Sequence, residues 1–193
     1  MWKSGGIVSK IAIGIMSSAL TIALAAPAFA YDLTHKRMNG QIWYVPQSVS
    51  LDASRDAFRS AMSTWNQHLP EWRRVCFSNT NHTSTSYPRK DGLNLIYKRS
   101  VGTNNYVAEN SYWWDNFNIL TKSDININTR LSWINGVQSG FYDVRSVMTH
   151  EVGHTVGLDH SERISAVMYI ASKPGTTKWF LTDDDINGIY AAY

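Results

Sequence analysis

The chain has 193 residues, with 18 Lys and Arg against 15 Asp and Glu, for a formal net charge of +3 at neutral pH. This length suits one domain with its own core and is short for two. The basic residues form no stripe that could follow a phosphate backbone, so no nucleic-acid partner is expected. Cys76 is the single cysteine, which excludes an internal disulfide. We expect it to be a buried apolar residue rather than a nucleophile or a dimer link.

Residues 1–30 have the organisation of a secretory signal peptide. Two lysines provide the positive start, an apolar stretch follows over residues 11–26, and Ala28-Phe29-Ala30 places small residues where a signal peptidase cuts. An uncleaved membrane anchor is the alternative, but the stretch is short for a bilayer span and contains polar residues. We therefore expect one domain over residues 31–193, secreted to the extracellular space or the periplasm. We expect it to be monomeric, with no membrane contact after signal removal.

The first half of that domain predicts strands around one amphipathic helix. Residues 41–45 form a first strand, ended by Pro46, and residues 51–67 form a helix ended by Pro70. The apolar face of that helix recurs at i, i+3, i+4 and i+7, as Phe58, Ala61, Met62 and Trp65. Two further strands are predicted at 74–77 and 93–98.

The next segments predict a loop and then a half-buried strand. Residues 102–117 are interpreted as a long polar and aromatic loop that contains Tyr112-Trp113-Trp114. Residues 122–129 alternate apolar and polar side chains, which predicts a strand with one solvated face, at a sheet edge.

The second half predicts two helices. Asp143 can cap a helix over about 144–156, and the capping box Thr182-x-x-Asp185 opens a helix that runs to the end of the chain. The residues expected on the buried face of this last helix are Ile186, Ile189, Tyr190 and Tyr193.

The chemistry-bearing motif lies between residues 150 and 160. His150 and His154 are four apart on the predicted helix, so both rings can face one metal ion, and Glu151 is close enough to reach a water there. Gly157 can take the left-handed conformation that ends a helix and turns His160 back towards the ion. Three imidazoles leave a fourth position open, as in catalytic zinc sites. A helix with surface histidines is the alternative, which the glycine and the third histidine at these offsets disfavour.

His150-Glu151-x-x-His154-x-x-Gly157-x-x-His160 resembles the signature of the metzincin zinc metallopeptidases. Ser161 after the third histidine and Val167-Met168-Tyr169, which is similar to the matrixin Met-turn, point to the matrixin, or matrix-metalloproteinase-like, branch. The resemblance is close over residues 147–190 and loose over the rest of the predicted domain. It implies that Met168 packs beneath the metal as a supporting residue rather than a ligand.

The resemblance implies an α+β fold: a twisted, mixed, mostly parallel five-stranded sheet with three helices, in which the active-site helix precedes a small C-terminal subdomain. It also implies an extended polypeptide substrate lying along an edge strand, expected here at 124–129. Asp184 and Asp185 have two interpretations. They are helix-dipole and capping charges, or, as the resemblance implies, one binds the ammonium of a mature N-terminus at Tyr31 and the other supports the Met-turn.

Three departures from the matrixin pattern bear on these expectations. The predicted domain follows the signal directly, so we expect no cysteine-switch propeptide. Residues 99–130 contain no histidine, so a second, structural zinc is not expected, and structural Ca²⁺ is left open. Ile170 and Ser172 alter the pattern after the Met-turn, so no cleavage preference is transferred.

The motif predicts a zinc metalloendopeptidase with one catalytic Zn²⁺. In this hypothesis the metal activates a water, Glu151 takes its proton as general base, and Glu151 then protonates the leaving amine. One alternative is a catalytically silent secreted binding module that uses Tyr112, Trp113 and Trp114 to stack on ligands. Another is a peptidase restricted to small peptides, which fits less well because nothing predicts an obstructed cleft.

Overall fold

The computed structural model describes residues 7–13, 31–34, 37–38, 41–46, 52–80, 93–100 and 106–193. The remaining residues of the predicted signal peptide lie outside these ranges. No helix within them combines the length and the apolar character that a bilayer crossing requires.

Five strands form the main sheet, as the resemblance implied. They are β3 (Gln41–Pro46), β4 (Val75–Thr80), β5 (Asn94–Arg99), β6 (Tyr106–Trp114) and β7 (Ile119–Asn128). Their spatial order is β6-β7-β5-β3-β4. All neighbours pair in parallel except β6 and β7, which are antiparallel. The sheet is therefore mixed and mostly parallel.

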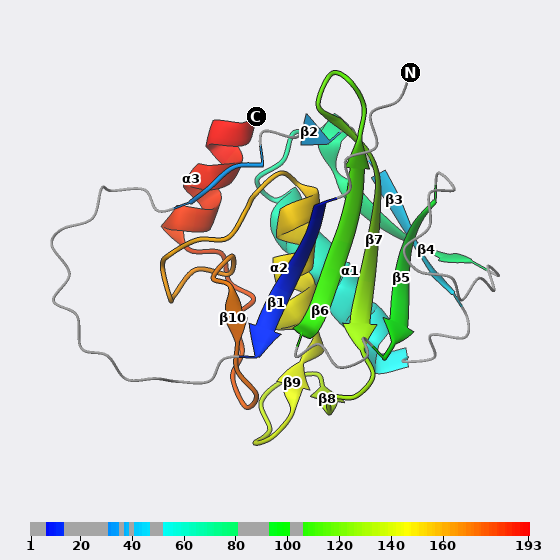
Figure 1. Cartoon of the computed structure of the whole chain (residues 1–193), viewed down its shortest axis with the longest axis vertical. Coiled ribbons are helices and arrows are strands. Elements are labelled where there is room, and N and C mark those ends of the chain that lie inside the picture. Colours follow the sequence, from blue (N-terminus) through cyan, green and yellow to red (C-terminus); the bar gives the residue numbers. More distant parts are fainter. Residues whose placement is uncertain are drawn as a thin grey trace, which may run out of the picture.

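Three further strands extend this sheet to eight. β1 (Ile7–Ile13) pairs with the outer side of β6, and β10 (Ala171–Ser172) pairs with the outer side of β1. The short β2 (Arg37–Met38) pairs with β7. A separate two-stranded sheet joins β8 (Trp133–Ile134) to β9 (Tyr142–Asp143) just before the second helix. The β1 segment, drawn in blue in Figure 1, thus lies beside β6 although it falls within the predicted signal peptide.

Two of the three α-helices pack together against the sheet. α1 (Asp52–Asn66) and α2 (Val144–Thr155) lie on one side of it, whereas α3 (Asp183–Ala192) ends the chain at a distance from the strands (Figure 1). A short 3-10 turn, η1 (Glu71–Arg73), follows α1. The predicted face of α1 is buried in the main core, where it meets Met148 and Val152 of α2.

The segment predicted as a loop at 102–117 contains β6, and this prediction was wrong. β7 is therefore not an edge strand, because it pairs with β6 on one side and β5 on the other. The polar residues that suggested a solvated face, Asp124, Asn126 and Asn128, are buried. Asp124 Oδ1 accepts the amide of Leu95 at 3.1 Å, and Asn128 Nδ2 donates to the carbonyl of Tyr106 at 2.8 Å.

Two burial predictions were also wrong. Cys76 is exposed in β4, because alternate residues of a strand face opposite sides and its neighbour Val75 faces the core. Tyr190 is 61% exposed, while Ile189 beside it is buried. Its ring packs edge-on against His68, with 6.0 Å between centroids.

Candidate metal centre

Helix α2 brings His150 and His154 together, as the i, i+4 spacing predicted. The helix begins after Asp143, whose carboxylate accepts the amide of Ser146 at 2.7 Å, so the predicted cap is confirmed. Both histidines are buried, and their Nε2 atoms lie 3.1 Å apart. The two rings meet edge to face, with 4.7 Å between centroids.

Backbone carbonyls fix the orientation of both rings. His150 Nδ1 donates to the carbonyl of Val167 at 2.8 Å, and His154 Nδ1 donates to the carbonyl of Leu158 at 2.9 Å. A carbonyl can only accept, so Nδ1 must carry the proton and Nε2 keeps its lone pair. The two Nε2 lone pairs are therefore prepared to bind a cation between them.

Gly157 turns the chain after α2, as predicted. Its φ is 105°, in the left-handed region that favours glycine. The amide of Leu158 bonds back to the carbonyl of Gly153 at 3.1 Å, which closes the helix end. The reversal brings the ring of His160 to 5.3 Å from that of His150 and 4.8 Å from that of His154, centroid to centroid.

The segment 32–34 is hydrogen-bonded to this bend, which no pattern in the sequence indicates. The amide of Thr34 donates to the carbonyl of Gly157 at 3.0 Å, and the amide of Asp159 donates to the carbonyl of Asp32 at 2.9 Å. These are backbone contacts between segments more than 120 residues apart, so no side-chain pattern could signal them.

The three histidines are held as neutral rings. Burial, and after it the neighbouring histidines, lower the pKa of His150 well below its ordinary value and the pKa of His154 to about 3. Burial also lowers the pKa of His160, although the carboxylate of Asp159 opposes this. Neutral imidazole is the form that ligates a metal.

Glu151 is 0% exposed, and its two carboxylate oxygens make no hydrogen bond within the described part of the chain. Burial raises its pKa well above the ordinary value, and the negative charge of Glu109 on β6 raises it further. His160 Nε2 is likewise buried without a hydrogen-bond partner among the described residues. Leaving such groups unsatisfied costs about 1–3 kcal/mol each, so they indicate a group that the polypeptide itself does not supply.

Zinc fits these donors. Two imidazole nitrogens at about 2.0–2.1 Å from one tetrahedral zinc lie about 3.3 Å apart, and the observed separation is 3.1 Å. The ligand atoms of His150, His154 and His160 all lie within 4.8 Å of one another. They form the one cluster of three or more metal-ligating side chains among the described residues. Three neutral imidazoles could hold a zinc ion and leave one coordination position for water or substrate.

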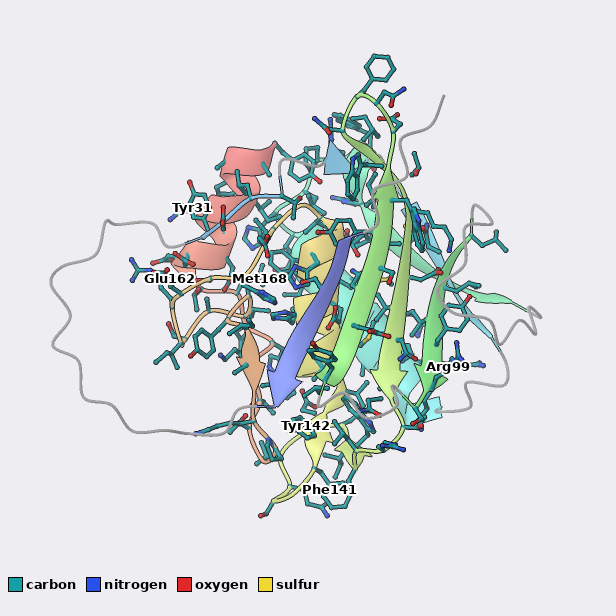
Figure 2. All side chains as sticks on the ribbon, in the orientation of Figure 1. Tyr31, Arg99, Phe141, Tyr142, Glu162 and Met168 are labelled. Atoms are coloured by element: carbon teal, nitrogen blue, oxygen red, sulfur yellow. The ribbon has the colours of Figure 1, made fainter. Side chains whose placement is uncertain are left out.

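Asp185 supports the turn that carries Met168. Its carboxylate accepts the amides of Val167 and Met168, each at 3.0 Å. It also accepts the amide and hydroxyl of Thr182, at 2.8 and 2.7 Å, which ties the start of α3 to the turn. Met168 is buried against Gly153, on the turn of α2 between the two helical histidines, and Figure 2 shows it beside that helix.

Asp184 supports the loop after His160 instead. Its carboxylate accepts from the hydroxyl of Ser161 at 2.6 Å and from the guanidinium of Arg163 at 3.1 Å. Tyr31, the predicted first residue after signal removal, packs against Gly188 of α3 (Figure 2). Binding of an N-terminal ammonium by Asp184 stays a prediction.

A buried polar cluster joins α2 to the sheet beside Glu151. Asn110 Nδ2 of β6 donates to the carbonyl of Glu151 at 2.8 Å and to Thr155 Oγ1 at 2.9 Å. Ser123 Oγ of β7 donates to Asn110 Oδ1 at 2.7 Å. The sequence interpretation missed this cluster because it placed Asn110 in a loop.

Comparison with known proteins agrees with this geometry. A model of the matrixin family matches residues 34–193. Metalloendoproteinase 1-MMP of Arabidopsis thaliana is 30% identical over 152 residues, which are 72% of this chain and 37% of that protein. Interstitial collagenase A of Mus musculus is 28% identical over 151 residues, which are 78% of this chain and 30% of that protein. Metalloendoproteinase 1 of Glycine max is 46% identical over 52 residues, 27% of this chain and 17% of that protein.

The chain spans well under half the length of each of these relatives. The family match itself, however, covers most of this chain and includes all three clustered histidines, Glu151 and the Met168 turn. On that match and the α+β architecture that carries the cluster, the chain belongs to the matrixin family.

Proposed function

We propose that this protein is a secreted zinc-dependent endopeptidase that hydrolyses peptide bonds within polypeptides. The observation that carries the proposal is the pairing of three converging, neutral histidines with the buried carboxylate of Glu151, which has no hydrogen-bond partner among the described residues. The names of the relatives, which include metalloendoproteinases and a collagenase, support the same activity.

In the proposed mechanism, His150, His154 and His160 hold one zinc ion through nitrogen lone pairs. Zinc, when bound, supplies Lewis-acid polarisation of the scissile carbonyl and makes a water more acidic. Glu151 accepts the proton of that water and afterwards delivers it to the leaving amine. A carboxyl group whose pKa is raised by burial suits the first step, because it gains a proton more readily than an exposed glutamate does.

The proposed substrate is an extended polypeptide that pairs with β6. The sequence-based expectation put the substrate along 124–129, but β7 is interior, whereas β6 is the outermost strand of the five-stranded sheet on this side. The histidine cluster is close to that outer side, because β1, which pairs there, contacts His154 through Ser9 Oγ at 2.7 Å. Backbone pairing would supply affinity without selecting a sequence.

The binding-module alternative loses its support, because the aromatic residues proposed to stack on ligands are largely internal. Tyr112 is buried in the main core, and Trp114 packs against the same core. Trp113 is partly buried, with the ammonium of Lys122 5.1 Å from its ring centroid. These contacts favour packing over ligand stacking.

The test compares residues 31–193 with the Glu151→Gln variant on a peptide library, with zinc content measured in both. We expect one zinc per chain in each protein and a loss of activity of about 10²–10⁴-fold in the variant. Glu162→Gln, an exposed carboxylate in the loop after His160, is the matched control and should retain activity. Substantial peptidase activity in Glu151→Gln would refute the role of that residue, and absence of zinc from the folded protein would refute the proposed function.

A further inference from the structure

Asn110 connects the strand that is proposed to bind substrate with the helix that carries Glu151. It lies in β6 and is 0% exposed. Its Nδ2 donates to the carbonyl of Glu151 at 2.8 Å and to Thr155 Oγ1 at 2.9 Å. A carbonyl oxygen can only accept, so the amide nitrogen must face α2 and the orientation of this amide group is fixed. Both of its donor positions are therefore used on the turn of α2 that runs from Glu151 to Thr155.

Three buried side chains close a ring of hydrogen bonds at this contact. Ser123 Oγ of β7 donates to Asn110 Oδ1 at 2.7 Å, and Ser123 Oγ lies 3.0 Å from Thr155 Oγ1. Ser123 has one hydroxyl proton and gives it to Asn110, so Thr155 must be the donor in the contact between the hydroxyls. The carbonyl of Glu151, the other acceptor near Thr155 Oγ1, is farther away at 3.4 Å. Hydrogen bonds that share partners in this way polarise and strengthen one another, so the ring holds α2, β6 and β7 together.

The backbone of Asn110 lies at the point of β6 that is closest to the histidine cluster. In β1, which pairs with the outer side of β6, the residue opposite Asn110 is Ser9, and Ser9 Oγ lies 2.7 Å from His154 Nε2. A polypeptide paired along the same edge would therefore place the residue opposite Asn110 beside the proposed metal. Asn110 thus adjoins the expected substrate position with its backbone and holds Glu151 with its side chain.

Apolar packing between α2 and β6 does not fix this relation in the same way. Val107 and Ala108 of β6 lie in a small apolar cluster with Val147 of α2. Apolar burial is not directional, so it resists separation of the helix from the strand more than it resists sliding. A hydrogen bond has a narrow range of length and angle, and therefore sets where the helix lies along the strand.

We propose that Asn110 is a positioning residue for the proposed reaction: through its ring with Thr155 and Ser123, it sets the distance between Glu151 and a substrate paired along β6. This inference rests on the proposed function. His150 and His154 are on the same helix as Glu151 and would move with it, so Asn110 controls the placement of the substrate rather than the binding of the metal. A misplacement of about 1 Å can lower a reaction rate by about a hundredfold.

The main test is Asn110→Leu, which keeps the branched outline of the side chain and removes its donors and acceptor. The variant is expressed from the full chain with export, and mass spectrometry checks that it has the same N-terminus as the unmutated protein. We expect kcat on a peptide substrate to fall by about ten- to a hundredfold. The KM should stay within about threefold, because the backbone of β6 can still pair with substrate. The zinc content should be the same in both proteins.

Asn66→Leu is the matched control. Asn66, the last residue of α1, also joins a helix to a strand: its Nδ2 donates to the carbonyl of Val75 at 2.7 Å, and its Oδ1 accepts the amide of Val75 at 2.8 Å. Val75 begins β4, at the opposite end of the five-stranded sheet from β6. We expect Asn66→Leu to lower the free energy of unfolding but to leave kcat and KM unchanged. A similar loss of kcat in both variants would show that Asn110 acts only through stability and would overturn the inference.

The other two members of the ring provide milder variants, which also serve if Asn110→Leu does not fold. Ser123→Ala should lower kcat by about threefold or more alone, and should cause no further loss in Asn110→Leu, because the ring is already open there. Thr155→Val should also lower kcat, and Thr155→Ser, which keeps the hydroxyl, should recover most of that loss. Independent, additive losses for Ser123→Ala and Asn110→Leu would contradict a closed ring.

Crystal structures of the variants separate failure of this inference from failure of the proposed function. We expect Glu151 to move by roughly 0.5–1 Å relative to β6 in Asn110→Leu, and not to move in Asn66→Leu. An unmoved Glu151, or an unchanged kcat, in Asn110→Leu would overturn the inference while the peptidase proposal stood. An unmutated protein that binds zinc but cleaves no peptide would overturn the proposed function, and with it the role of Asn110 in catalysis. The structures would still decide whether Asn110 fixes the position of Glu151.

Discussion

Gly153 has no room for a side chain, and Gly153→Ala tests how tightly the centre is packed. A Cβ built on Gly153 would overlap Met168 Sδ and lie 2.8 Å from Cζ2 of Trp65. Carbon atoms in contact prefer about 3.5–4.0 Å, so the indole would have to recede by roughly 0.7–1.2 Å. Trp65 is buried, and its Nε1 donates to the carbonyl of Thr149 at 2.7 Å, which resists that movement.

The expected magnitude follows from two opposing effects. Overpacking a core costs about 1–3 kcal/mol, whereas replacing glycine by alanine in a helix returns about 1 kcal/mol. Because two buried side chains are displaced, we expect the overpacking cost to lie in the upper half of its range of about 1–3 kcal/mol. We expect Gly153→Ala to lower the free energy of unfolding by about 1–2 kcal/mol. Urea denaturation of the metal-free protein measures this without a contribution from metal binding.

A double-mutant cycle with Met168→Ala identifies the cause. Met168→Ala alone should cost about 2–5 kcal/mol because it leaves a cavity, and an alanine methyl at position 153 can occupy part of that space. At least half of the loss due to Gly153→Ala should therefore disappear in the Met168→Ala background. An equal loss in both backgrounds, or no loss in either, would show that contact between Gly153 and Met168 does not limit the packing of the centre.

Three further predictions concern charged groups around the histidines. In metal-free Glu151→Gln, stability should fall as the pH drops below about 6.5, by up to about 1.4 kcal/mol per pH unit for each histidine. The reason is that the histidine rings of the unfolded chain gain protons, while His154 in the folded protein, with a pKa of about 3, stays neutral. Equal free energies of unfolding in urea titrations at pH 7 and pH 5 would contradict this. The stability of the unmutated metal-free protein should fall less as the pH drops. The pKa of Glu151 is raised in the folded protein, so proton binding at Glu151 favours the folded state and partly offsets the effect of the histidines. Asp185→Asn should cost about 2–4 kcal/mol in thermal or urea unfolding and weaken zinc binding in equilibrium competition, because an amide nitrogen cannot accept the bonds now made by the carboxylate. Arg163→Ala should cost less than about 1 kcal/mol by the same unfolding assay, since the arginine side chain is 42% exposed and Ser161 still bonds to the carboxylate; a larger loss would contradict this.

Local spacing was sufficient to predict the histidine cluster and the helices that hold it. His150 and His154 meet because a helix repeats every 3.6 residues, and His160 joins them because Gly157 adopts the left-handed turn that was expected. The buried face of α1 and the cap at Asp143 follow from equally short-range patterns. Each of these features depends on residues within a few positions of one another, so one stretch of sequence contains the whole cause.

Strand pairing could not be predicted in the same way. Asp124 and Asn128 of β7 look like residues of a solvated face, yet they can be buried because backbone groups of β5 and β6 supply their hydrogen bonds. Without those partners in view, β6 was interpreted as a loop and β7 as an edge strand.

The sequence by itself determined which side chains converge: three histidines, with Glu151 one step along the helix from the first. Only the tertiary structure decided which strand lies beside them, which backbone segment braces their turn and which segment covers them. Those outcomes are hydrogen bonds between peptide groups far apart along the chain. Because every residue type except proline carries the same backbone donor and acceptor, the residue pattern does not specify which distant segments pair.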